Sequence, residues 1–262
     1  MPSDRLHRRN LLKALAGIGG LTVSGCDRLA SEPRLRSVLG SANDFTYKVQ
    51  RLVIGAHRLA REYSEADISP AFQANGSTDP QDEEYLNLAG NHFADWRLTV
   101  DGLVEHELSL SLAELRALPA RTQITRQDCV EGWSCIAKWT GVPLAEILSR
   151  AVVRPKARFV VFHCADTLDD GEFGADPEGI RYYESIDLID AAHPQTILAY
   201  DMNGQPLTVP YGAPLRLRLE RQLGYKMAKY IMRIELVQSL DDLHGGLGGY
   251  WEDRGYEWYA GI

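Results

Sequence analysis

One short run of the sequence, residues 126–134, places a cysteine between a strand-like segment and a glycine-containing turn. The run reads Arg-Gln-Asp-Cys-Val-Glu-Gly-Trp-Ser, so Cys129 stands at the junction, with Gly132 and Trp133 shortly after it. A thiolate is a soft metal ligand, and a thiol at the end of a strand can be reached by a bound group. Cys129 is therefore a candidate metal ligand. The alternative is that it is a small buried apolar residue, which is a common role for an unpaired cysteine.

The other cysteines do not add to a metal-binding or disulfide pattern. The chain has four, Cys26, Cys129, Cys135 and Cys164, and none of them stands in a C-x-x-C pair. This spacing argues against a structural zinc site and against a disulfide scaffold. A second alternative for Cys129 is a disulfide with Cys135 in an oxidising compartment, which would exclude a role as ligand.

Two segments, residues 211–216 and 224–229, combine glycine with basic side chains. Arg216 can bind a phosphate group through its forked N–H donors, and Lys226 and Lys229 offer two ammonium groups one turn apart. The glycines in both segments permit a close approach of the backbone. Together these residues could hold an anionic tail of a cofactor. The alternative is that the basic residues line an exposed strand face.

The cysteine run and four further blocks resemble the molybdopterin-dependent oxidoreductases of the sulfite oxidase family. The likeness is strongest to the bacterial branch that includes periplasmic methionine sulfoxide reductase catalytic subunits. The blocks are residues 91–93, residues 162–166, residues 199–207, and the pair 211–216 with 224–229. The resemblance covers roughly residues 84–262, which is most of the chain after the N-terminal segments.

The resemblance implies an α+β fold of the sulfite oxidase type, with a single catalytic domain that binds molybdopterin carrying molybdenum. It implies that Cys129 is the protein ligand to the metal. It also implies a set of cofactor contacts, which are Asn91, His92, Phe93, Cys164, Asp166, Tyr211, Arg216, Lys226, Met227, Ala228 and Lys229.

Departures from the family pattern bear on the substrate and on the electron donor. Gly90 stands where sulfite oxidases have an arginine that helps to hold the anionic substrate. A charge-assisted hydrogen bond of this kind contributes roughly 1.5–3 kcal/mol, so its loss weighs against sulfite. Tyr211 replaces the histidine of the family's H-G-x-P segment, and the chain has no C-x-x-C-H haem motif. We therefore expect a separate cytochrome-type or quinol-linked electron-transfer partner.

The C-terminal run, residues 250–259, is unusually rich in aromatic side chains. In the family a W-x-x-R-x-Y segment places a tyrosine hydroxyl beside the metal, and Trp251, Arg254 and Tyr256 have this spacing. The resemblance thus implies that Tyr256 is a catalytic hydrogen-bond donor. The alternative is an aromatic lid that only buries apolar area. The glycines before this run leave open whether Tyr250 or Tyr256 faces the metal.

Composition excludes some classes of protein. The 262 residues are 45% hydrophobic and 24% charged, which is typical of a globular chain. A formal net charge of −8 provides no basic field that could follow a phosphate backbone. Nucleic acid is therefore not expected as a partner. A small-molecule substrate is expected instead.

The first 26 residues are typical of an export signal. Arg8 and Arg9 precede an apolar run at 14–23, which is too short to span a membrane and resembles a twin-arginine signal. The alternative is a chance arginine pair in a general secretory signal. Cys26 ends a lipobox-like segment, so a lipid anchor is one possibility and plain cleavage near Gly25 is the other. We expect a periplasmic protein, with anchoring to the inner membrane through Cys26 left open.

The elements that must position these residues follow from apolar periodicity. We predict a tether and N-terminal helical segment over 27–80, with a helix at 44–63 capped by Asp44, and the molybdopterin-binding oxidoreductase domain over 81–262. No regular βαβ alternation is present, which favours an α+β class. Within the domain the predicted strands are 97–100, 123–126, 158–163, 197–202, 215–219 and 231–237, the last closing the sheet, and the predicted helices are 112–118, 144–150 and 185–192.

The functional hypothesis is two-electron oxygen-atom transfer at a cysteine-ligated molybdenum. Reduction of a sulfoxide is the leading reaction, and oxidation of sulfite or another small oxyanion is the alternative. A hypothesis of a different class is a lipoprotein that keeps the fold as a binding module without catalysis.

Overall fold

The computed structural model describes residues 45–52, 55, 57–168 and 179–262. The chain divides into two compact units, Met1–Val53 and Ile54–Ile262, and the described part of the first unit is a helix at 45–52. The arginine pair, Cys26 and Asp44 lie outside the described residues. In the part of the chain that is described, no helix is long and apolar enough to cross a bilayer.

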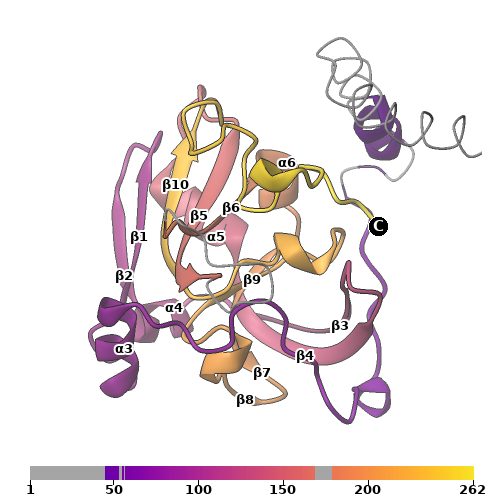
Figure 1. Cartoon of the computed structure of the whole chain (residues 1–262), viewed down its shortest axis with the longest axis vertical. Coiled ribbons are helices and arrows are strands. Elements are labelled where there is room, and N and C mark those ends of the chain that lie inside the picture. The colour runs from indigo at the N-terminus through magenta and orange to yellow at the C-terminus, as the bar shows by residue number, and fades with distance from the viewer. Residues whose placement is uncertain (1–44, 53–54, 56, 169–178) are drawn as a thin grey trace, which may run out of the picture. The chain divides into compact units, whose positions relative to one another are not determined.

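Among its described residues the second unit contains four α-helices, four short 3₁₀ turns and ten strands, and Figure 1 labels most of them. In chain order its elements are η1 (Glu65–Asp67), α3 (Glu83–Gly90), β1 (Arg97–Gly102), β2 (Leu108–Ser111), α4 (Leu112–Arg116), β3 (Arg121–Asp128), β4 (Ser134–Pro143), α5 (Leu144–Ala151), β5 (Phe159–Thr167), β6 (Arg181–Asp187), α6 (Leu188–Ala191), β7 (Ile197–Met202), β8 (Gln205–Pro206), η2 (Val209–Tyr211), β9 (Arg216–Arg218), η3 (Gly224–Lys226), β10 (Ile231–Val237) and η4 (Glu252–Arg254).

The strands form two mixed or antiparallel sheets. The first has the order β2-β1-β10-β5-β6, with β1 and β10 parallel and the other pairs antiparallel. The second has the order β3-β4-β7-β8, and β9 pairs with β7. Sheets of this kind joined by short helices confirm the predicted α+β class. The expectation that residues 231–237 close the sheet is wrong, because β10 lies at the centre of the first sheet, where Ile231, Ile234 and Leu236 are buried.

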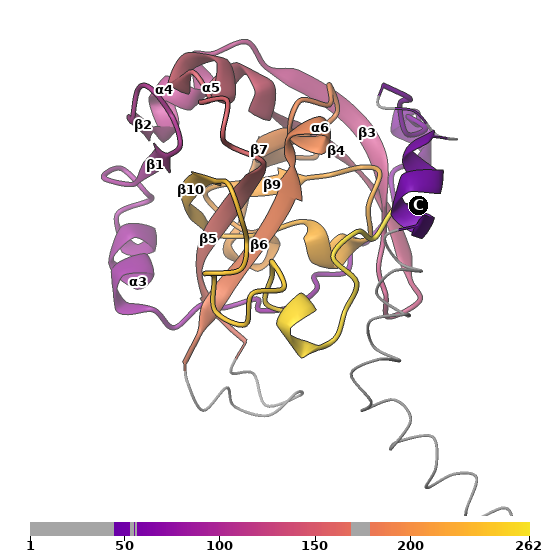
Figure 2. The ribbon, with the colours of Figure 1, turned by 90° about the horizontal axis from the view of Figure 1, so that it is seen from above.

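Short helices cover the apolar core at one end of this unit, beside β2 and β4 (Figure 2). In α5 the buried residues Leu144, Ile147, Leu148 and Ala151 recur at helical spacing. In α4 the Ser111 side chain accepts from the backbone of Glu114, whose carboxylate accepts from the Ser111 backbone at 2.8 Å, which forms a capping box. The predicted helix starts at 112 and 144 are therefore confirmed.

The hairpin of β3 and β4 leads to the cysteine run, and the buried face of β3 is polar. Gln123, Thr125 and Gln127 are the buried residues of β3, at alternating positions. Because side chains alternate across a strand, the next residue on this face is Cys129. Gln127 accepts from the buried guanidinium of Arg218 at 2.6 Å, so the amides of this face are held by hydrogen bonds within the protein.

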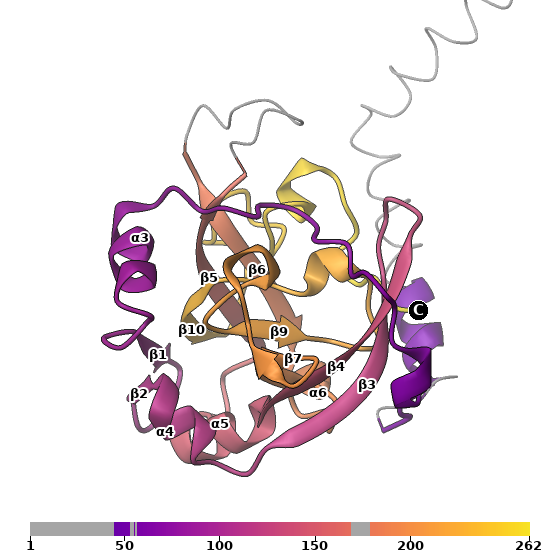
Figure 3. The ribbon, with the colours of Figure 1, turned by 90° about the horizontal axis from the view of Figure 1, so that it is seen from below.

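The chain before α3 runs from the β3–β4 hairpin across to α3 (Figure 3). The backbone N–H of Tyr63 donates to the carbonyl of Ile124 at 2.9 Å, and that of Ser69 donates to the carbonyl of Ile136 at 3.0 Å. The predicted helix at 44–63 is confirmed over 45–52 and is wrong at 57–63, where the chain is not helical and Glu62 and Tyr63 pair with β3. Pairing to a strand edge overrides the helical spacing of the sequence.

One further helix prediction needs correction. The predicted helix at 185–192 begins only at Leu188, because Ser185 and Asp187 belong to β6. The Asp187 side chain accepts from the backbone N–H of Asp190 at 2.7 Å and so caps α6. Pairing of β6 with β5 extends the strand to the cap itself.

Candidate functional site

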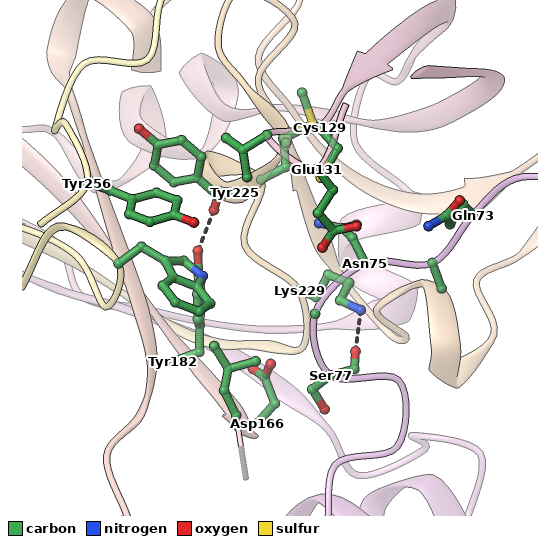
Figure 4. Close-up of a pocket in the computed structure, with 17 residues that line it drawn as sticks. Gln73, Asn75, Ser77, Cys129, Glu131, Asp166, Tyr182, Tyr225, Lys229 and Tyr256 are labelled. Carbon is green, nitrogen blue, oxygen red and sulfur yellow. Dashed lines mark hydrogen bonds between the residues drawn. The ribbon is translucent and has the colours of Figure 1, made fainter. Parts of the chain in front are cut away.

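A cavity of about 280 Å³ lies where the β3–β4 turn meets the segment before α3 and the C-terminal segment (Figure 4). This volume is near the lower end of small-molecule sites, which are about 300–1,000 Å³. The described residues that line the cavity are Gln73, Ala74, Asn75, Gly76, Ser77, Cys129, Val130, Glu131, Asp166, Leu168, Tyr182, Gly224, Tyr225, Met227, Lys229, Trp251 and Tyr256.

Cys129 lies at the first position after β3, in a tight turn that leads into β4. Its backbone N–H donates to the carbonyl of Trp133 at 3.0 Å, and Gly132 supplies the positive φ of 87° that the turn needs. The side chain is 9% exposed, and burial raises the pKa of its thiol. Backbone N–H groups of Glu131 and Val130 act in the opposite direction, because they donate toward the sulfur.

The described cysteines are all free. Cys129, Cys135 and Cys164 form no disulfide, so the alternative of a bond between Cys129 and Cys135 is wrong for this structure. Cys164 is buried and does not line the cavity. Of these three thiols, Cys129 alone lines the cavity, where it is available to a bound group.

Asp166 and Lys229 contribute an acid and a base to the cavity. Asp166 is 3% exposed, its Oδ1 has no hydrogen-bond partner among the described residues, and burial raises the pKa of its carboxyl to about 7. The Lys229 ammonium donates to the carbonyl of Ser77 and, at 3.2 Å, to that of Pro210. Burial, with a smaller effect of the neighbouring Arg216, lowers the pKa of this amine to about 7. Both groups can therefore gain or lose a proton near neutral pH.

Aromatic rings form the remaining wall. Tyr256 stacks on Trp251 with ring centroids 5.2 Å apart and meets Tyr225 edge-on at 5.1 Å. In Figure 4 the ring of Tyr256 points into the cavity. Tyr250 is buried and packs against the ring of Tyr182, and it does not line the cavity. Tyr256 is thus the tyrosine of the two that faces the site, and it is both a stacked aromatic and a possible donor.

The cavity residues fit the metal-bearing end of a molybdopterin. A free thiol at the cavity wall suits a soft metal centre, and the unpartnered Oδ1 of Asp166 is a buried acceptor that lacks a donor. The backbone at Gly224 lies close to the end of β3, because a Cβ there would be 3.2 Å from the Gln127 side chain and 3.3 Å from the Asp128 carbonyl. These features are those of a polar site prepared for a ligand rather than of a filled core.

The structure brings five of the predicted site residues to the cavity wall, namely Cys129, Asp166, Met227, Lys229 and Tyr256. The Asn91 block lies elsewhere. The amide of Asn91 donates to Asp95 at 2.7 Å on the surface, and His92 and Phe93 line a separate groove. Both of these last two residues have a positive φ, 57° and 59°. Their predicted role in cofactor binding stays a prediction.

The remaining predicted residues pack behind the wall. The Tyr211 hydroxyl donates to the carbonyl of Phe72 at 2.9 Å, and Ala228 is buried in the core beside Cys164. The Arg216 guanidinium is buried, donates to the carbonyl of Tyr211 at 3.1 Å, and has an Nε without a partner among the described residues. Burial, with a further effect of Arg218, lowers the pKa of Arg216 to about 9.

Lys226 also lies behind the wall, where its ammonium contacts two carboxylates. It donates to Glu184 and, at 2.6 Å, to Glu252, and all three side chains are essentially unexposed. The basic residues were expected to form one anion-binding set, and the structure separates them into different environments. Among the described residues, only Lys229 of this set lines the cavity.

Several lining residues were missed from the sequence. Residues 73–77 belong to the predicted tether and N-terminal helical segment over 27–80, yet all five line the cavity. The Asn75 side chain accepts from the Gln127 amide at 3.1 Å, which ties this segment to β3. Gly76, with a φ of 60°, turns the backbone there. The Asn-Gly-Ser sequence at 75–77 was the available signal, since it indicates a tight polar turn.

Comparison with known proteins identifies the family. Residues 87–243 match the family model described as oxidoreductase molybdopterin binding domain. The chain belongs to this family. The family and enzyme class predicted from the sequence, together with the molybdopterin cofactor, are thereby confirmed. Residues 73–77, Trp251 and Tyr256, which complete the cavity, flank the matched residues of this molybdopterin-binding oxidoreductase.

Related proteins carry names from the same class. The oxidoreductase is 36% identical over 255 residues to a protein of Azospira oryzae provisionally named protein-methionine-sulfoxide reductase subunit YedZ1, covering 97% of this chain and 87% of that one. It is 32% identical over 252 residues to the protein-methionine-sulfoxide reductase catalytic subunit MsrP of Xanthomonas campestris, covering 90% and 71%. A solved structure, the sulfane dehydrogenase SoxCD from Paracoccus pantotrophus, aligns with a TM-score of 0.48 and 22% identity over 55% of this chain and 39% of that one.

Proposed function

We propose that this molybdopterin oxidoreductase reduces methionine sulfoxide and that Cys129 is the protein ligand to its molybdenum. The observation that carries the proposal is the presence of Cys129, Asp166, Lys229 and Tyr256 on the wall of one cavity. Two relatives that align with most of the chain have names of methionine sulfoxide reductases. When bound, the cofactor supplies two-electron oxygen-atom transfer, and the protein orients the substrate and handles protons.

The charge of the cavity favours a neutral sulfoxide over sulfite. Glu131 and Asp166 line it, and Lys229 is the basic side chain among the described lining residues. An anionic substrate would meet two acidic groups and one amine, whereas a sulfoxide carries a dipole and no net charge. Gly90 lies at the end of α3 and does not line the cavity, so the argument from the missing arginine stays a prediction.

The side chains divide the work of the reaction. Reduction of a sulfoxide consumes two electrons and two protons and releases a thioether and water. Asp166 and Lys229, whose pKa values lie near 7, can hold and deliver protons at neutral pH. The Tyr256 hydroxyl can donate a hydrogen bond to the sulfoxide oxygen, while the rings of Trp251 and Tyr225 contact the apolar part of the substrate.

The same proposal includes export and a partner. The N-terminal arginine pair supports transport of a folded, cofactor-loaded protein to the periplasm, and Cys26 offers a site for a lipid anchor. The word subunit in the relatives' names supports an electron-delivering partner, for which we propose a cytochrome-type or quinol-linked membrane protein. Cell fractionation of the Arg8→Lys, Arg9→Lys variant and of Cys26→Ala tests the placement.

Cysteine labelling tests the metal ligand without an activity assay. Cofactor-free and molybdenum-loaded protein would be treated with iodoacetamide at alkaline pH and analysed by peptide mass spectrometry. We expect Cys129 to be alkylated only in the cofactor-free protein, since a metal-bound thiolate is not free to react. Cys135, which is partly exposed, should react in both forms, and buried Cys164 in neither. Equal labelling of Cys129 in the two forms would contradict the assignment.

A substrate panel tests the reaction. With a reduced dye as electron donor, the loaded enzyme should turn over methionine sulfoxide, and with an artificial acceptor it should oxidise sulfite at a negligible rate. Efficient sulfite oxidation would reverse this order and support the alternative reaction.

A further inference from the structure

We propose that Lys226 is a positioning residue, which with Glu184 and Glu252 fixes the aromatic segment, residues 250–259, at the cavity. The Lys226 ammonium donates to one carboxylate oxygen of each glutamate, at 2.6 Å for Glu252. The exposed fractions of the three side chains are 0%, 0% and 1%. A buried ion cluster of this kind requires all its partners, because removal of one leaves an uncompensated buried charge.

The cluster joins three elements that each present side chains to the cavity. Lys226 ends η3, whose Tyr225 lines the cavity. Glu184 lies on β6, two residues after the lining residue Tyr182. Glu252 begins η4, directly after Trp251 of the lining set. The three charged groups therefore hold together the walls that carry the aromatic rings.

Further contacts connect the same elements. The Tyr182 hydroxyl donates to the carbonyl of Tyr225, and the Tyr225 hydroxyl donates to the carbonyl of Glu257 at 2.6 Å. The Lys226 ammonium also lies 5.5 Å from the centre of the Trp258 ring. Lys226 thus contacts the aromatic segment twice, once through a carboxylate and once through an aromatic face.

The chain before the aromatic segment depends on such contacts for its order. Four glycines stand between residues 245 and 249, and glycine loses more conformational entropy on folding than any other residue. At Gly249 a Cβ would lie only 2.0 Å from the Glu252 carboxylate and 2.8 Å from that of Glu184. This position therefore admits the two carboxylates only because it has no side chain.

The charges of the cluster do not suit an anionic cofactor tail. One ammonium is surrounded by two carboxylates, so the formal charge of the group is at most neutral when one glutamate is protonated. A phosphate would therefore meet no net positive charge, and the ammonium has no exposed surface to offer it. A cation reserved for cofactor binding would be expected to reach the cavity, as Lys229 does.

The test compares Lys226→Met with Lys138→Met in molybdenum-loaded protein. Lys138 is the matched control, since it pairs with Glu65 on the surface, away from the cavity. Hydrogen exchange would be followed by mass spectrometry in peptides that cover residues 250–259 and 73–77, together with molybdenum content and sulfoxide turnover. We expect Lys226→Met to exchange at least about tenfold faster in residues 250–259, with molybdenum content unchanged and turnover reduced about tenfold. Lys138→Met should match the wild type.

Two outcomes would overturn the proposal. One is unchanged exchange in residues 250–259, and the other is loss of molybdenum with faster exchange at 73–77, which would assign Lys226 to the cofactor. If Lys226→Met does not fold, Glu252→Gln decides, because it keeps the shape and removes one carboxylate; it should loosen residues 250–259 alone, and unchanged exchange there would again overturn the proposal. The role of the cavity rests on the proposed function, but exchange and metal content report on Lys226 even if the enzyme does not reduce sulfoxides.

Discussion

Lys226 and Lys229 stand three residues apart in one basic segment, and the structure gives them opposite surroundings. Burial acts to lower the pKa of Lys226, but the carboxylates of Glu184 and Glu252 outweigh it and the pKa is raised. Lys229 is buried as well, but its ammonium donates to two backbone carbonyls instead of two carboxylates, and its pKa is lowered to about 7. The first lysine is a permanent cation inside the protein, and the second can exchange a proton at the cavity. The same residue type therefore serves structure in one place and chemistry in the other.

The largest effect is expected from Lys229→Met. Removal of the cavity amine deletes a proton donor, and general acid–base groups typically contribute about 10²–10⁴-fold, so sulfoxide turnover should fall by about 100-fold or more. Turnover should be expressed per bound molybdenum, because Lys229 lines the cavity that would hold the cofactor. Steady-state kinetics of Lys229→Met and Lys226→Met, measured side by side, compare the loss of turnover in the two variants. Equal losses in the two variants would break the distinction between the lysines.

An intermediate effect is expected from Asp166→Asn on the stability of cofactor-free protein. The folded-state pKa of Asp166 is raised by burial to about 7, so its contribution to stability is complete below the unfolded-state value near 4 and is lost as pH rises toward 7. The asparagine variant cannot show this loss. The melting temperature of the asparagine variant should therefore rise relative to that of the wild type as pH increases from about 4 to about 7. A difference in melting temperature that does not change with pH would contradict a carboxyl group whose pKa is raised by burial.

The pH dependence of Lys229 has the opposite sign. Its folded-state pKa is lowered, so the stability that it contributes is present above the unfolded-state value and is lost as pH falls through about 7. Near neutral pH the cofactor-free wild type should therefore have lost the stability contributed by Asp166 at low pH and that contributed by Lys229 at high pH. Thermal melts of Lys229→Met against wild type between pH 7 and 10 measure this second arm. The melting temperature of the wild type should rise relative to that of Lys229→Met between pH 7 and pH 10. A difference between the two melting temperatures that does not change over this range would argue against an amine whose pKa is lowered by burial.

The smallest effect is expected from Tyr256→Phe, which keeps the stacked ring and deletes the hydroxyl. If the hydroxyl donates to the substrate oxygen, turnover should fall by about tenfold, in the range of one hydrogen bond to a polar group. Stability and exchange at residues 250–259 should not change, because the ring contacts with Trp251 and Tyr225 remain. Turnover equal to that of the wild type would leave Tyr256 as a packing residue of the aromatic segment.

Much of the fold could be predicted from local pattern. The strands at 197–202 and 231–237 have the predicted bounds, and the Ser111 cap begins a helix where the sequence indicates one. The errors occur where tertiary pairing decides. Residues 57–63 carry a helical spacing but are not helical, because Glu62 and Tyr63 pair with β3, and residues 185–187 continue a strand because β5 pairs with them.

The site was predictable where a motif carries its own chemistry. Cys129 and Lys229 line the cavity as their residue types suggest. Lys226 could not be separated from Lys229, because its carboxylate partners lie 42 and 26 residues away along the chain. Residues 73–77 were missed for the same reason, since only the fold brings them to β3.

The cavity takes its walls from residues 73–77 on one flank and from Trp251 and Tyr256 on the other, with Cys129 between them in the sequence. During synthesis the cysteine leaves the ribosome long before the aromatic rings do. A nascent chain that ends near residue 240 would hold the thiol but lack both rings and Glu252 of the ion cluster. The enclosed site can therefore form only after residue 256 has emerged from the ribosome.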